Sequence, residues 1–589
     1  MGFRADVLRA LEGALGADVA AAGDLDAALT TPPKIEMGDL AFPCFALAKV
    51  KKKAPPAIAA ELAATIAPTG AIAKVQALGP FVNFHADPAK QLDDLCQRLV
   101  DGRFDAEART DAPARVMIEF SQPNTHKLFH VGHLRNVVLG DALVRAFRAR
   151  GHDVVAANYY GDFGIDVAKC LWWIRTHPEE TVPVEHRIAW LGSCYVRATQ
   201  LVAELEASDP EKATTTKASI REVLRGMEEG DPDIRALYEE TRQWCLDGFQ
   251  AIYDQLDVRF DHDFFESQVE HEGQAIVDEQ LAKGVFVESQ GAIICDLTEE
   301  GLGACLVRKG DGASLYMTWD LALARRKFDD FDVERSMYVV GSEQRHHFQQ
   351  LFATLARMGY ERAKDCRHVA YELVMLPSGK MSSRKGTAIP LHVLWDTVRD
   401  AIRTRMESEG RDERAGWDAT RWNETVERVV VACLKYGMLH VTNNRRVVFD
   451  VEAWTNPEGD TGAYLLYALA RIAGIQRKAE GPVPTLADGV KDGGSSEGEV
   501  FGHETERALL GHLLTWPDVL ARMESTCEPA VVATFLFDAT KLFSRFYAAC
   551  PILKAPEPLR TARLQLVNAT EAVLRRGFEV LGLPVVDAM

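Results

Sequence analysis

Two short motifs in distant parts of the chain carry the residue types needed to transfer a nucleotide. The first is His130-Val131-Gly132-His133, and the second runs Lys-Met-Ser-Ser-Arg-Lys-Gly from Lys380 to Gly386. Imidazoles can donate hydrogen bonds to a phosphate, and a glycine between them lets a flat ring such as adenine approach the backbone closely. The cations and hydroxyls of the second motif suit a leaving pyrophosphate. Together the two motifs predict nucleotidyl transfer from ATP.

The sequence around the first motif indicates how its histidines are held. An apolar run at Val116–Phe120 precedes it, and a helical pattern begins at Leu134. This order of strand, loop and helix places the motif at a helix N-terminus, where unpaired N–H groups and the helix dipole favour an anion. A lone histidine is more often a satisfied core residue, but histidines around a glycine at such a turn favour function.

The two motifs define a predicted nucleotide site. The predicted catalytic residues are His130, Gly132, His133, Lys380, Arg384 and Lys385, and the predicted ATP contacts add His126, Lys127, Met381 and Ser382. Which of the three cations in the second motif meets pyrophosphate is left open. A solvated basic loop is the ordinary interpretation of such a charge run, but the flanking Gly379 and Gly386 favour a mobile lid.

The bulk composition narrows the class of protein. With 589 residues the chain should form several domains, and 47% hydrophobic with 26% charged residues is ordinary for a globular protein. A net charge of −19 argues against nonspecific coating of nucleic acid but allows a local basic patch. Neither a membrane span nor a secretory signal is evident, so we expect a cytoplasmic protein with no membrane partner. The 11 cysteines stand singly, so no metal ligands are predicted.

Changes of pattern along the chain predict three domains. Residues 1–112 combine helices with a strand at 75–84 and form an expected α+β N-terminal domain. From 113 to 400 apolar strands alternate with helices, which predicts a Rossmann-type parallel-sheet domain with a helical insertion at about 165–290. Strand signals then fade, so 401–589 is expected to be an all-α C-terminal domain. The predicted fold class is multidomain α/β.

Several segments together resemble the class I arginyl-tRNA synthetases. Phe120–Asn136, around the first motif, is similar to that family's first signature. Tyr159–Gly164, Ser314–Ala322, Val339–Phe348 and Asp460–Ile472 agree with the family in order and spacing. The second motif departs from the general class I pattern Lys-Met-Ser-Lys-Ser, but a hydroxyl residue followed by Arg-Lys-Gly is familiar in the arginyl branch. The resemblance covers nearly the whole chain and implies that the C-terminal domain binds the anticodon.

The resemblance implies an arginine–tRNA ligase. Such an enzyme activates L-arginine with ATP, accompanied by Mg²⁺, to arginyl adenylate, releases pyrophosphate, and transfers arginine to the terminal adenosine of tRNA(Arg). The implied arginine contacts are Glu119, Ser121, Asn124, Tyr316, Asp320 and Gln344. A planar guanidinium is best met by carboxylates, a role that suits Glu119 and Asp320. Asn124 and Gln344 would hold the backbone groups of the amino acid.

By the same resemblance, two regions contact tRNA. The implied contacts are Phe81, Asn83 and Phe84 in the N-terminal domain, and Asn444, Tyr464 and Arg471 in the helical domain. An aromatic beside an asparagine can bind an unpaired base, although a core position for the two phenylalanines is an equally good interpretation. We expect a monomer. The alternative function is a synthetase-like RNA-binding or regulatory protein without charging activity, against which intact His130, His133 and Lys380 argue.

Overall fold

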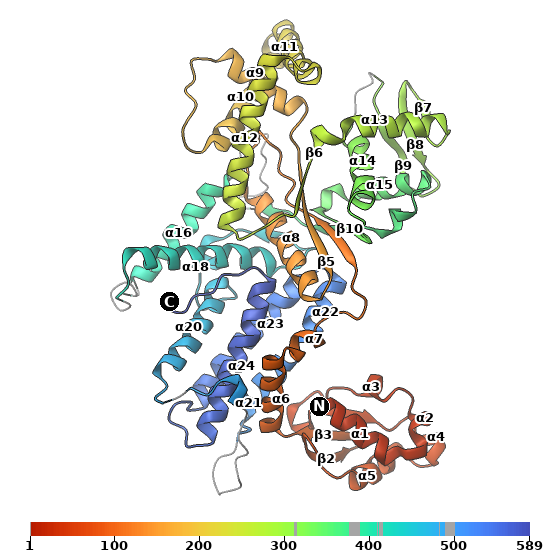
Figure 1. The fold of residues 1–589 in the computed structure, drawn as a ribbon, viewed down its shortest axis with the longest axis vertical. Helices are drawn as coiled ribbons and strands as arrows, with labels where there is room; N and C mark the ends of the chain where they lie inside the picture. The colour runs from red at the N-terminus through yellow and green to blue at the C-terminus, as the bar shows by residue number, and fades with distance from the viewer. Residues whose placement is uncertain are drawn as a thin grey trace.

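A five-stranded parallel sheet is formed by strands that lie between Arg115 and Tyr371 (Figure 1). This computed structural model describes residues 2–310, 315–375, 389–408, 410, 416–481, 483–488 and 501–589. The strands, in spatial order, are β11 (Cys366–Tyr371), β10 (Arg335–Gly341), β4 (Arg115–Glu119), β5 (Asp153–Tyr160) and β6 (His262–Phe265), and all neighbours are parallel. All three predicted strands are confirmed. The strand predicted at 116–120 matches β4 to within one residue at each end, and those predicted at 154–158 and 337–340 lie inside β5 and β10.

The central strand β4 marks the point where the order of the sheet reverses. It pairs with β5 on one side and with β10 on the other, and such a switch point opens a ligand-binding crevice at the carboxyl ends of the strands. Helix α8 (Val131–Ala149) follows β4 and begins at the first motif, as predicted. A Cβ at Gly140 of α8 would lie only 2.1 Å from Phe120 Cγ, so the glycine allows the helix to pack closely against the sheet.

A helical insertion separates β5 from β6. It consists of α9 (Ile165–Thr176), α10 (Arg187–Ser208), α11 (Pro210–Glu229) and α12 (Pro232–Gln255). The last two helices begin at a proline after a capping aspartate, Asp209 and Asp231 respectively. The predicted insertion at 165–290 is therefore corrected: β6 belongs to the central sheet, because it pairs with β5, and it interrupts that range.

The segments around the central sheet add a small antiparallel sheet and several helices. After β6 come α13 (Glu266–Ala282), the sheet of β7 (Val287–Ser289), β8 (Ala292–Leu297) and β9 (Gly303–Arg308), and α14 (Tyr316–Asp329). Helix α15 (Arg345–Arg357) follows β10 through a short 3₁₀ turn, Ser342–Gln344. The two-residue strand β12 (Val374–Met375) pairs with β13 (Val447–Val448).

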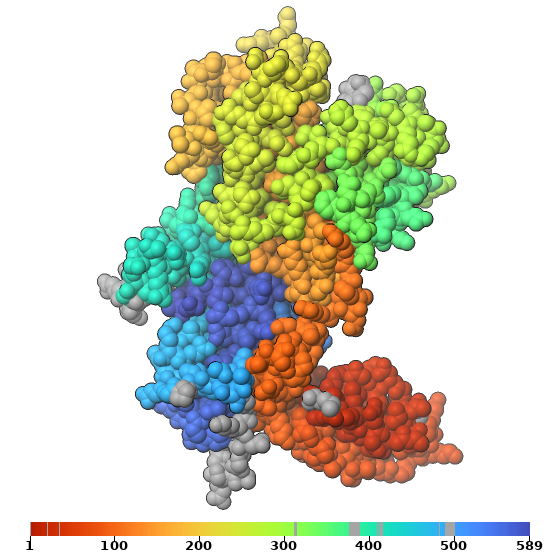
Figure 2. Space-filling view, in the orientation of Figure 1, coloured from red at the N-terminus to blue at the C-terminus, as the bar shows by residue number. Residues whose placement is uncertain are grey.

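The N-terminal unit forms a lobe with its own core, at one end of the molecule (Figure 2). Helices α1 (Phe3–Leu15), α2 (Val19–Ala22), α3 (Leu25–Ala28), α4 (Ala48–Lys51) and α5 (Pro55–Thr65) accompany a sheet of β1 (Leu40–Pro43), β3 (Phe81–Ala86) and β2 (Ile72–Leu78). The single strand predicted at 75–84 is instead a hairpin, since Gly79 has a φ of +57° and starts a turn. Helices α6 (Pro88–Asp101) and α7 (Arg103–Glu107) lead to β4.

The C-terminal part is a helical bundle that shares its core with α8. Its helices are α16 (Leu391–Ser408), α18 (Ala419–Leu439), α19 (Val451–Trp454), α20 (Gly462–Lys478), α21 (Glu504–Leu514), α22 (Trp516–Thr526), α23 (Ala530–Ala549) and α24 (Leu559–Val580). Gly462 lets α20 approach α18, because a Cβ there would lie 2.3 Å from the Ala432 carbonyl oxygen. None of the helices that the structure describes has both the length and the apolar character needed to cross a membrane.

Candidate active site

The two histidines of the first motif lie at the first turn of α8. His130 Nδ1 accepts a hydrogen bond from Gly132 N–H at 3.1 Å, and His133 Nδ1 accepts one from His130 N–H at 3.1 Å. The two ring centroids are 4.0 Å apart. Because each Nδ1 is an acceptor, Nε2 of each neutral ring carries the proton and can donate it to a phosphate oxygen.

The environment keeps both imidazoles neutral at pH 7. Burial lowers the pKa of His130 to about 4. Burial, followed by the nearby His130 and Lys127, lowers the pKa of His133 well below its ordinary value. The glycine between them is required by space, since a Cβ on Gly132 would lie 2.9 Å from His130 Cε1. The first turn of α8 therefore offers neutral donors at a helix N-terminus, which suits an anion.

The structure describes residues on either side of the second motif but not the motif itself. Its predicted contacts, Lys380, Met381, Ser382, Arg384 and Lys385, lie outside the described residues. Next to them in the chain, Pro390 pairs with His130, and Leu391 N–H donates a hydrogen bond to the Phe129 carbonyl oxygen at 3.0 Å. The segment that follows the second motif thus runs beside the first motif.

The prediction that His126 contacts ATP is contradicted by its surroundings. The side chain is fully buried, Nδ1 bonds Thr125 Oγ1 at 2.9 Å, and Nε2 bonds Thr241 Oγ1 of α12 at 2.8 Å. Burial, with the charge of Arg242, lowers its pKa to about 3. With both ring nitrogens occupied, His126 anchors the loop before α8 to the insertion and has no nitrogen left for a nucleotide.

Lys127, in contrast, faces a cavity. Its Nζ lies 2.7 Å from the Asp166 carboxylate. Burial opposes the positive charge, but the Asp166 carboxylate outweighs that effect and raises the pKa of Lys127. An ammonium group is therefore held close to the start of α8, and its predicted contact with ATP stays a prediction.

The loop between β4 and α8 has an unusual backbone. Ser121, Gln122 and His126 have φ values of +76°, +46° and +60°, a region that disfavours residues other than glycine. Asn136 Oδ1 accepts from Ser121 N–H at 2.6 Å, and Asn158 Oδ1 accepts from Gln122 N–H at 3.1 Å. These bonds to the helix and to β5 hold the strained loop in one conformation.

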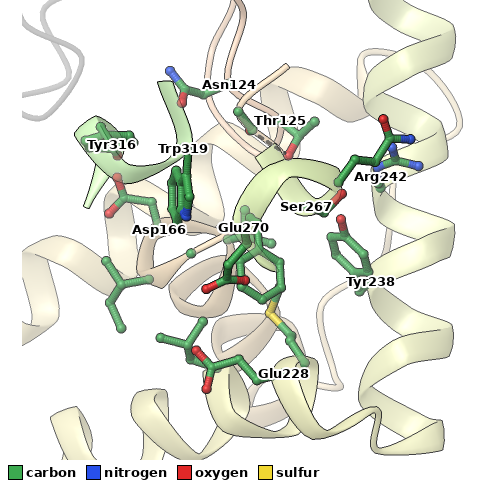
Figure 3. A pocket seen from close by; sticks show the side chains of 18 of the residues that line it. Asn124, Thr125, Asp166, Glu228, Tyr238, Arg242, Ser267, Glu270, Tyr316 and Trp319 are labelled. Carbon is green, nitrogen blue, oxygen red and sulfur yellow. Dashed lines mark hydrogen bonds between the residues drawn. The ribbon is translucent and has the colours of Figure 1, made fainter. Parts of the chain in front are cut away.

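A cavity of about 1140 Å³ opens between this loop, the insertion, α13 and the start of α14 (Figure 3). Asn124 and Tyr316, both predicted to contact arginine, line it together, and Tyr316 is 61% exposed. Asn124 lies tightly against Gly161 at the end of β5, where a Cβ would fall 2.4 Å from Asn124 Oδ1. Glycine at this position therefore leaves the space that the Asn124 amide occupies.

The two carboxylates predicted to meet a guanidinium already have cationic or hydrogen-bonding partners. Asp320 lies one turn after Tyr316 in α14, and its Oδ2 is 2.6 Å from His347 Nε2. Burial opposes protonation of His347, but the bond to Asp320 raises its pKa. Glu119 is 3% exposed and forms an ion pair with the wholly buried Lys327. Direct contact of either carboxylate with arginine stays a prediction.

The other two predicted arginine contacts are placed differently. The Ser121 side chain is buried, with its hydroxyl 2.7 Å from the Tyr253 hydroxyl. Gln344 is exposed at the end of the 3₁₀ turn after β10. Gln344 is therefore accessible, whereas Ser121 would have to leave its present partner to bind a ligand, and both arginine contacts stay predictions.

Sequence reasoning missed a third carboxyl group, that of Glu266 at the start of α13. It is 7% exposed, and burial, then the charges of Asp162 and Asp320, raise its pKa well above the ordinary value. A Cβ on Gly161 would lie 3.4 Å from its Oε2, so Glu266 borders the place where Asn124 lies. Its position after a strand was a weak signal, because only the pairing of β6 with β5 brings it to the site.

Asp162, directly after Gly161, connects this end of the cavity to the insertion. Its fully buried carboxylate accepts hydrogen bonds from Arg242 Nε at 2.8 Å and the Tyr238 hydroxyl at 3.0 Å, both on α12. It also accepts from Ser267 N–H at 3.0 Å and Ser267 Oγ at 2.8 Å on α13. One buried charge therefore ties the loop after β5 to two helices that line the cavity.

In the N-terminal lobe, two of the three predicted tRNA contacts are interior residues. Phe84 is fully buried, and Asn83 is 2% exposed with its Nδ2 donating to the Met37 carbonyl oxygen at 2.6 Å. A direct contact of either side chain with a base would require the lobe to open at this strand, and these contacts stay predictions. Phe81 remains half-exposed and makes an edge contact, 5.8 Å between centroids, with the exposed Phe45.

In the helical bundle, Arg471 lines a pocket of about 580 Å³ together with Tyr467 and Tyr547. Its guanidinium carbon lies 4.8 Å from the Tyr467 ring centroid and 5.4 Å from that of Tyr547. Lys554, Arg477, Lys478 and Met589 also line the pocket. Tyr464 instead packs on Phe537 at 5.6 Å, and Asn444 is exposed, so their predicted tRNA contacts stay predictions.

A parallel sheet with a switch point at β4 and a helix N-terminus built for an anion defines a nucleotide-dependent enzyme of the α/β class. Three family models cover most of the chain. They are the catalytic domain of class I tRNA synthetases (R) at residues 95–451, the DALR anticodon binding domain at 465–589, and the arginyl tRNA synthetase N terminal domain at 3–86.

Known proteins agree over nearly the full length. An arginine–tRNA ligase of Bdellovibrio bacteriovorus is 36% identical, with 96% of this chain and 95% of that protein covered. One of Streptococcus pyogenes is 35% identical, with 95% of each covered. The structure of the Thermus thermophilus arginyl-tRNA synthetase superposes with a TM-score of 0.76 at 25% identity, covering 100% of both chains. The chain therefore belongs to the arginyl-tRNA synthetase family.

Proposed function

We propose that the cavity beside Asn124 and Tyr316 binds arginine, and that the first turn of α8 binds the phosphates of ATP. As a member of its family, the chain is an ATP-dependent arginine–tRNA ligase. The observation that carries the proposed pocket is a convergence of acidic groups. Burial, then the nearby carboxyl groups of Asp320, Glu266, Glu119 and Asp162, raise the pKa of Tyr159, so four carboxyl groups lie near one buried phenol. Such a cluster suits a guanidinium.

In this proposal Asp320 and Glu266 face the guanidinium. Glu119, held by its ion pair with Lys327, lies behind them. Asn124, Ser121 and Gln344 are assigned to the amino and carboxyl groups of arginine. Because arginine brings its own positive charge, it would replace the contact that His347 now makes with Asp320. A site with paired polar groups rejects uncharged analogues strongly, since they would leave buried charges without a partner.

The chemistry of activation needs no nucleophile from the protein. The arginine carboxylate attacks the α-phosphorus, the bond from that phosphorus to the bridging oxygen breaks, and pyrophosphate leaves. We assign the neutral Nε2–H groups of His130 and His133 to the phosphate oxygens, with Gly132 giving the adenine access and Lys127 adding charge. Lys380, Met381, Ser382, Arg384 and Lys385 are proposed to act on the phosphates from the second motif. Mg²⁺ is proposed to arrive with ATP, whose phosphate oxygens are its preferred ligands.

For tRNA, the exposed Phe45 and Phe81 pair and the pocket around Arg471 are the proposed contacts. Two tyrosine rings beside a guanidinium form a stacking surface for an unpaired base, with further cations at the rim. Stacking on Phe81 would be aided by Phe45, which holds its ring edge-on. Tyr464 and Asn444 are retained as secondary contacts.

We also propose how the chain is organised in the cell. The division into 1–112, 113–400 and 401–589 assigns tRNA contact, catalysis and anticodon binding to successive domains. A cytoplasmic monomer is proposed. Sedimentation of the purified protein tests the oligomeric state.

Charging of unfractionated tRNA, with each amino acid supplied separately together with ATP and Mg²⁺, tests the proposed specificity. We expect arginine alone to be attached. Attachment of a different amino acid would refute the roles given to Asp320 and Glu266, and no attachment would favour a protein that only binds RNA.

A further inference from the structure

The Gln122 side chain joins two buried polar groups next to the strained loop after β4. Its Nε2 donates a hydrogen bond to Glu119 Oε1 at 2.9 Å, and its Oε1 accepts one from Asn136 Nδ2 at 3.0 Å. Because the carboxylate of Glu119 can only accept, this orientation of the amide is the one that satisfies both partners. The Gln122 amide is therefore a link with a donor at one end and an acceptor at the other.

One end of this link leads to the helix that borders the arginine cavity. The other oxygen of Glu119, Oε2, forms the ion pair with Lys327, whose Nζ lies 3.7 Å from the Tyr338 ring centroid. Lys327 is on α14, about two turns after Asp320, so both residues lie on the same side of that helix. The buried charge pair therefore fixes α14 relative to the end of β4.

The other end of the link leads to the helix of the proposed phosphate site. Asn136 is buried in α8, one turn after His133. Besides its bond to Gln122, its Nδ2 donates to the Val339 carbonyl oxygen of β10 at 3.0 Å, and its Oδ1 accepts from Ser121 N–H at 2.6 Å. A continuous chain of polar contacts therefore runs from α14 through the Gln122 amide to α8.

The backbone at Gln122 is held independently of its side chain. Gln122 has a φ of +46°, and its N–H donates to Asn158 Oδ1 at 3.1 Å. Every residue other than glycine meets the same strain at that φ, so a change to alanine or glutamate alters the link and leaves the turn. Gln122 does not line the arginine cavity that the described residues form. Any effect of its side chain on the reaction must therefore pass through Glu119 and Asn136.

We propose that Gln122 is a positioning residue that aligns the arginine site beside α14 with the phosphate site on α8. Attack of the arginine carboxylate on the α-phosphorus depends on the distance and angle between two separately held substrates, and a misplacement of about 1 Å can cost on the order of 100-fold in rate. Each site keeps its own contacts without the link, so its loss should lower kcat and leave both KM values nearly unchanged. The inference rests on the proposed arginine and phosphate sites and adds the residue that aligns them.

The test compares Gln122→Ala with Gln122→Glu in steady-state charging at saturating tRNA. Alanine removes the link. A protonated glutamate restores it, because its O–H can donate to Glu119 while its carbonyl oxygen accepts from Asn136. An ionised glutamate can only accept, and the Glu119 carboxylate repels it. Gln250→Glu is the matched control, since Gln250 Nε2 also donates to a carboxylate, that of Asp254 at 3.0 Å, but on the exposed side of α12.

The surroundings of the link set the pH range of the comparison. A carboxyl group in hydrogen-bond contact with Glu119 has a raised pKa, because a like charge disfavours its ionisation. The ion pair of Glu119 with Lys327 is present in every variant, so each kcat is divided by the wild-type value at the same pH. The phenols around the link are those of Tyr159, Tyr338 and Tyr371. Burial raises the pKa of all three, so they stay neutral between about pH 6 and about pH 8.5.

We expect Gln122→Ala to lower kcat about ten-fold or more, with the KM for arginine and the KM for ATP each within a factor of about three of wild type. The relative kcat of Gln122→Glu should rise about ten-fold from about pH 8.5 to about pH 6, as the new carboxyl group gains its proton. The relative kcat of Gln122→Ala and of Gln250→Glu should not change with pH. A general loss of folded protein would not produce such a recovery in one variant alone.

The proposal is overturned by any of three results. A kcat of Gln122→Ala within a factor of about two of wild type would show that the link is not needed for alignment. An effect confined to one KM would place Gln122 in the binding of that substrate. A low kcat of Gln122→Glu that does not recover at the lower pH would show that the side chain only maintains the fold. Failure of the wild-type protein to charge tRNA with arginine would instead overturn the underlying function.

Discussion

Replacing Asp320 by asparagine tests the proposed arginine pocket most directly. The substitution keeps the size of the side chain and removes its negative charge. In the structure Asp320 Oδ2 lies 2.6 Å from His347 Nε2, and its side chain is 19% exposed. Asparagine can still bond to His347 through its amide oxygen, so α14 and α15 should remain connected while the partner of the guanidinium is lost.

The size of the effect follows from the surroundings of Asp320. Removing one partner of a desolvated charged pair costs about 2–5 kcal/mol. Because Asp320 is partly exposed and Glu266 and Glu119 remain nearby, we expect the lower end, about 2 kcal/mol. At about 1.4 kcal/mol for each tenfold change, this raises the KM for arginine about 30-fold.

The assay is steady-state charging of tRNA with arginine and ATP varied separately. We expect the KM for ATP to stay within a factor of two, since the phosphate donors lie on α8. Glu272→Gln is the matched control: Glu272 is an exposed carboxylate on α13 that pairs with Arg326 of α14. An arginine KM unchanged within a factor of two in Asp320→Asn would show that Asp320 serves only His347, and the pocket assignment would be wrong.

Two further predictions concern the arginine pocket, and a third concerns the pocket around Arg471. Burial lowers the pKa of His347, but the bond to Asp320 outweighs this and raises it. The protonated ring competes with arginine for Asp320, so the arginine KM should fall as pH rises through that raised pKa. His347→Gln should abolish this pH dependence. Gly161→Ala would place a Cβ 2.4 Å from Asn124 Oδ1, and displacing that amide should raise the arginine KM about ten-fold or more, whereas Gly511→Ala, with open space around it, should not. Arg471→Ala should weaken tRNA binding about 5- to 150-fold, the range for one stacked base. The arginine KM, measured in charging assays at saturating tRNA, should not change. A tRNA affinity within a factor of two of wild type would show that the Arg471 pocket does not bind tRNA.

The sequence was most informative where a local pattern determines the structure. Val116–Phe120 is apolar except for Glu119 and predicts β4 (Arg115–Glu119) to within one residue at each end, and the motif that follows becomes the start of α8. Hydrophobic runs and helix-start signals act over a few residues. Asn124 and Tyr316 were also assigned to one site, and the structure brings them to one cavity. Their individual contacts with arginine remain predictions.

Features that depend on long-range packing could not be read from the chain. His126 lies only four residues before His130, but its ring bonds to Thr241 of α12, and its φ is positive; no periodicity in the sequence predicts that direction. Asn83 and Phe84 alternate as in any half-buried strand, and only the surrounding lobe decides that both are interior. Glu266 was missed because it reaches the cavity through the pairing of two strands that a four-helix insertion separates.

The pairing of β4 with β10 has a consequence for how the protein is made. Arg115 at the start of β4 bonds to Glu334, which lies 219 residues later in the chain. At about 5–20 residues per second, a ribosome needs roughly 11–44 s to add that length, during which one edge of β4 has no neighbour. An unpaired strand edge is an aggregation hazard, and the nascent chain carries this hazard until β10 emerges. The catalytic centre, which needs residues from both sides of this pair, is assembled only late in translation.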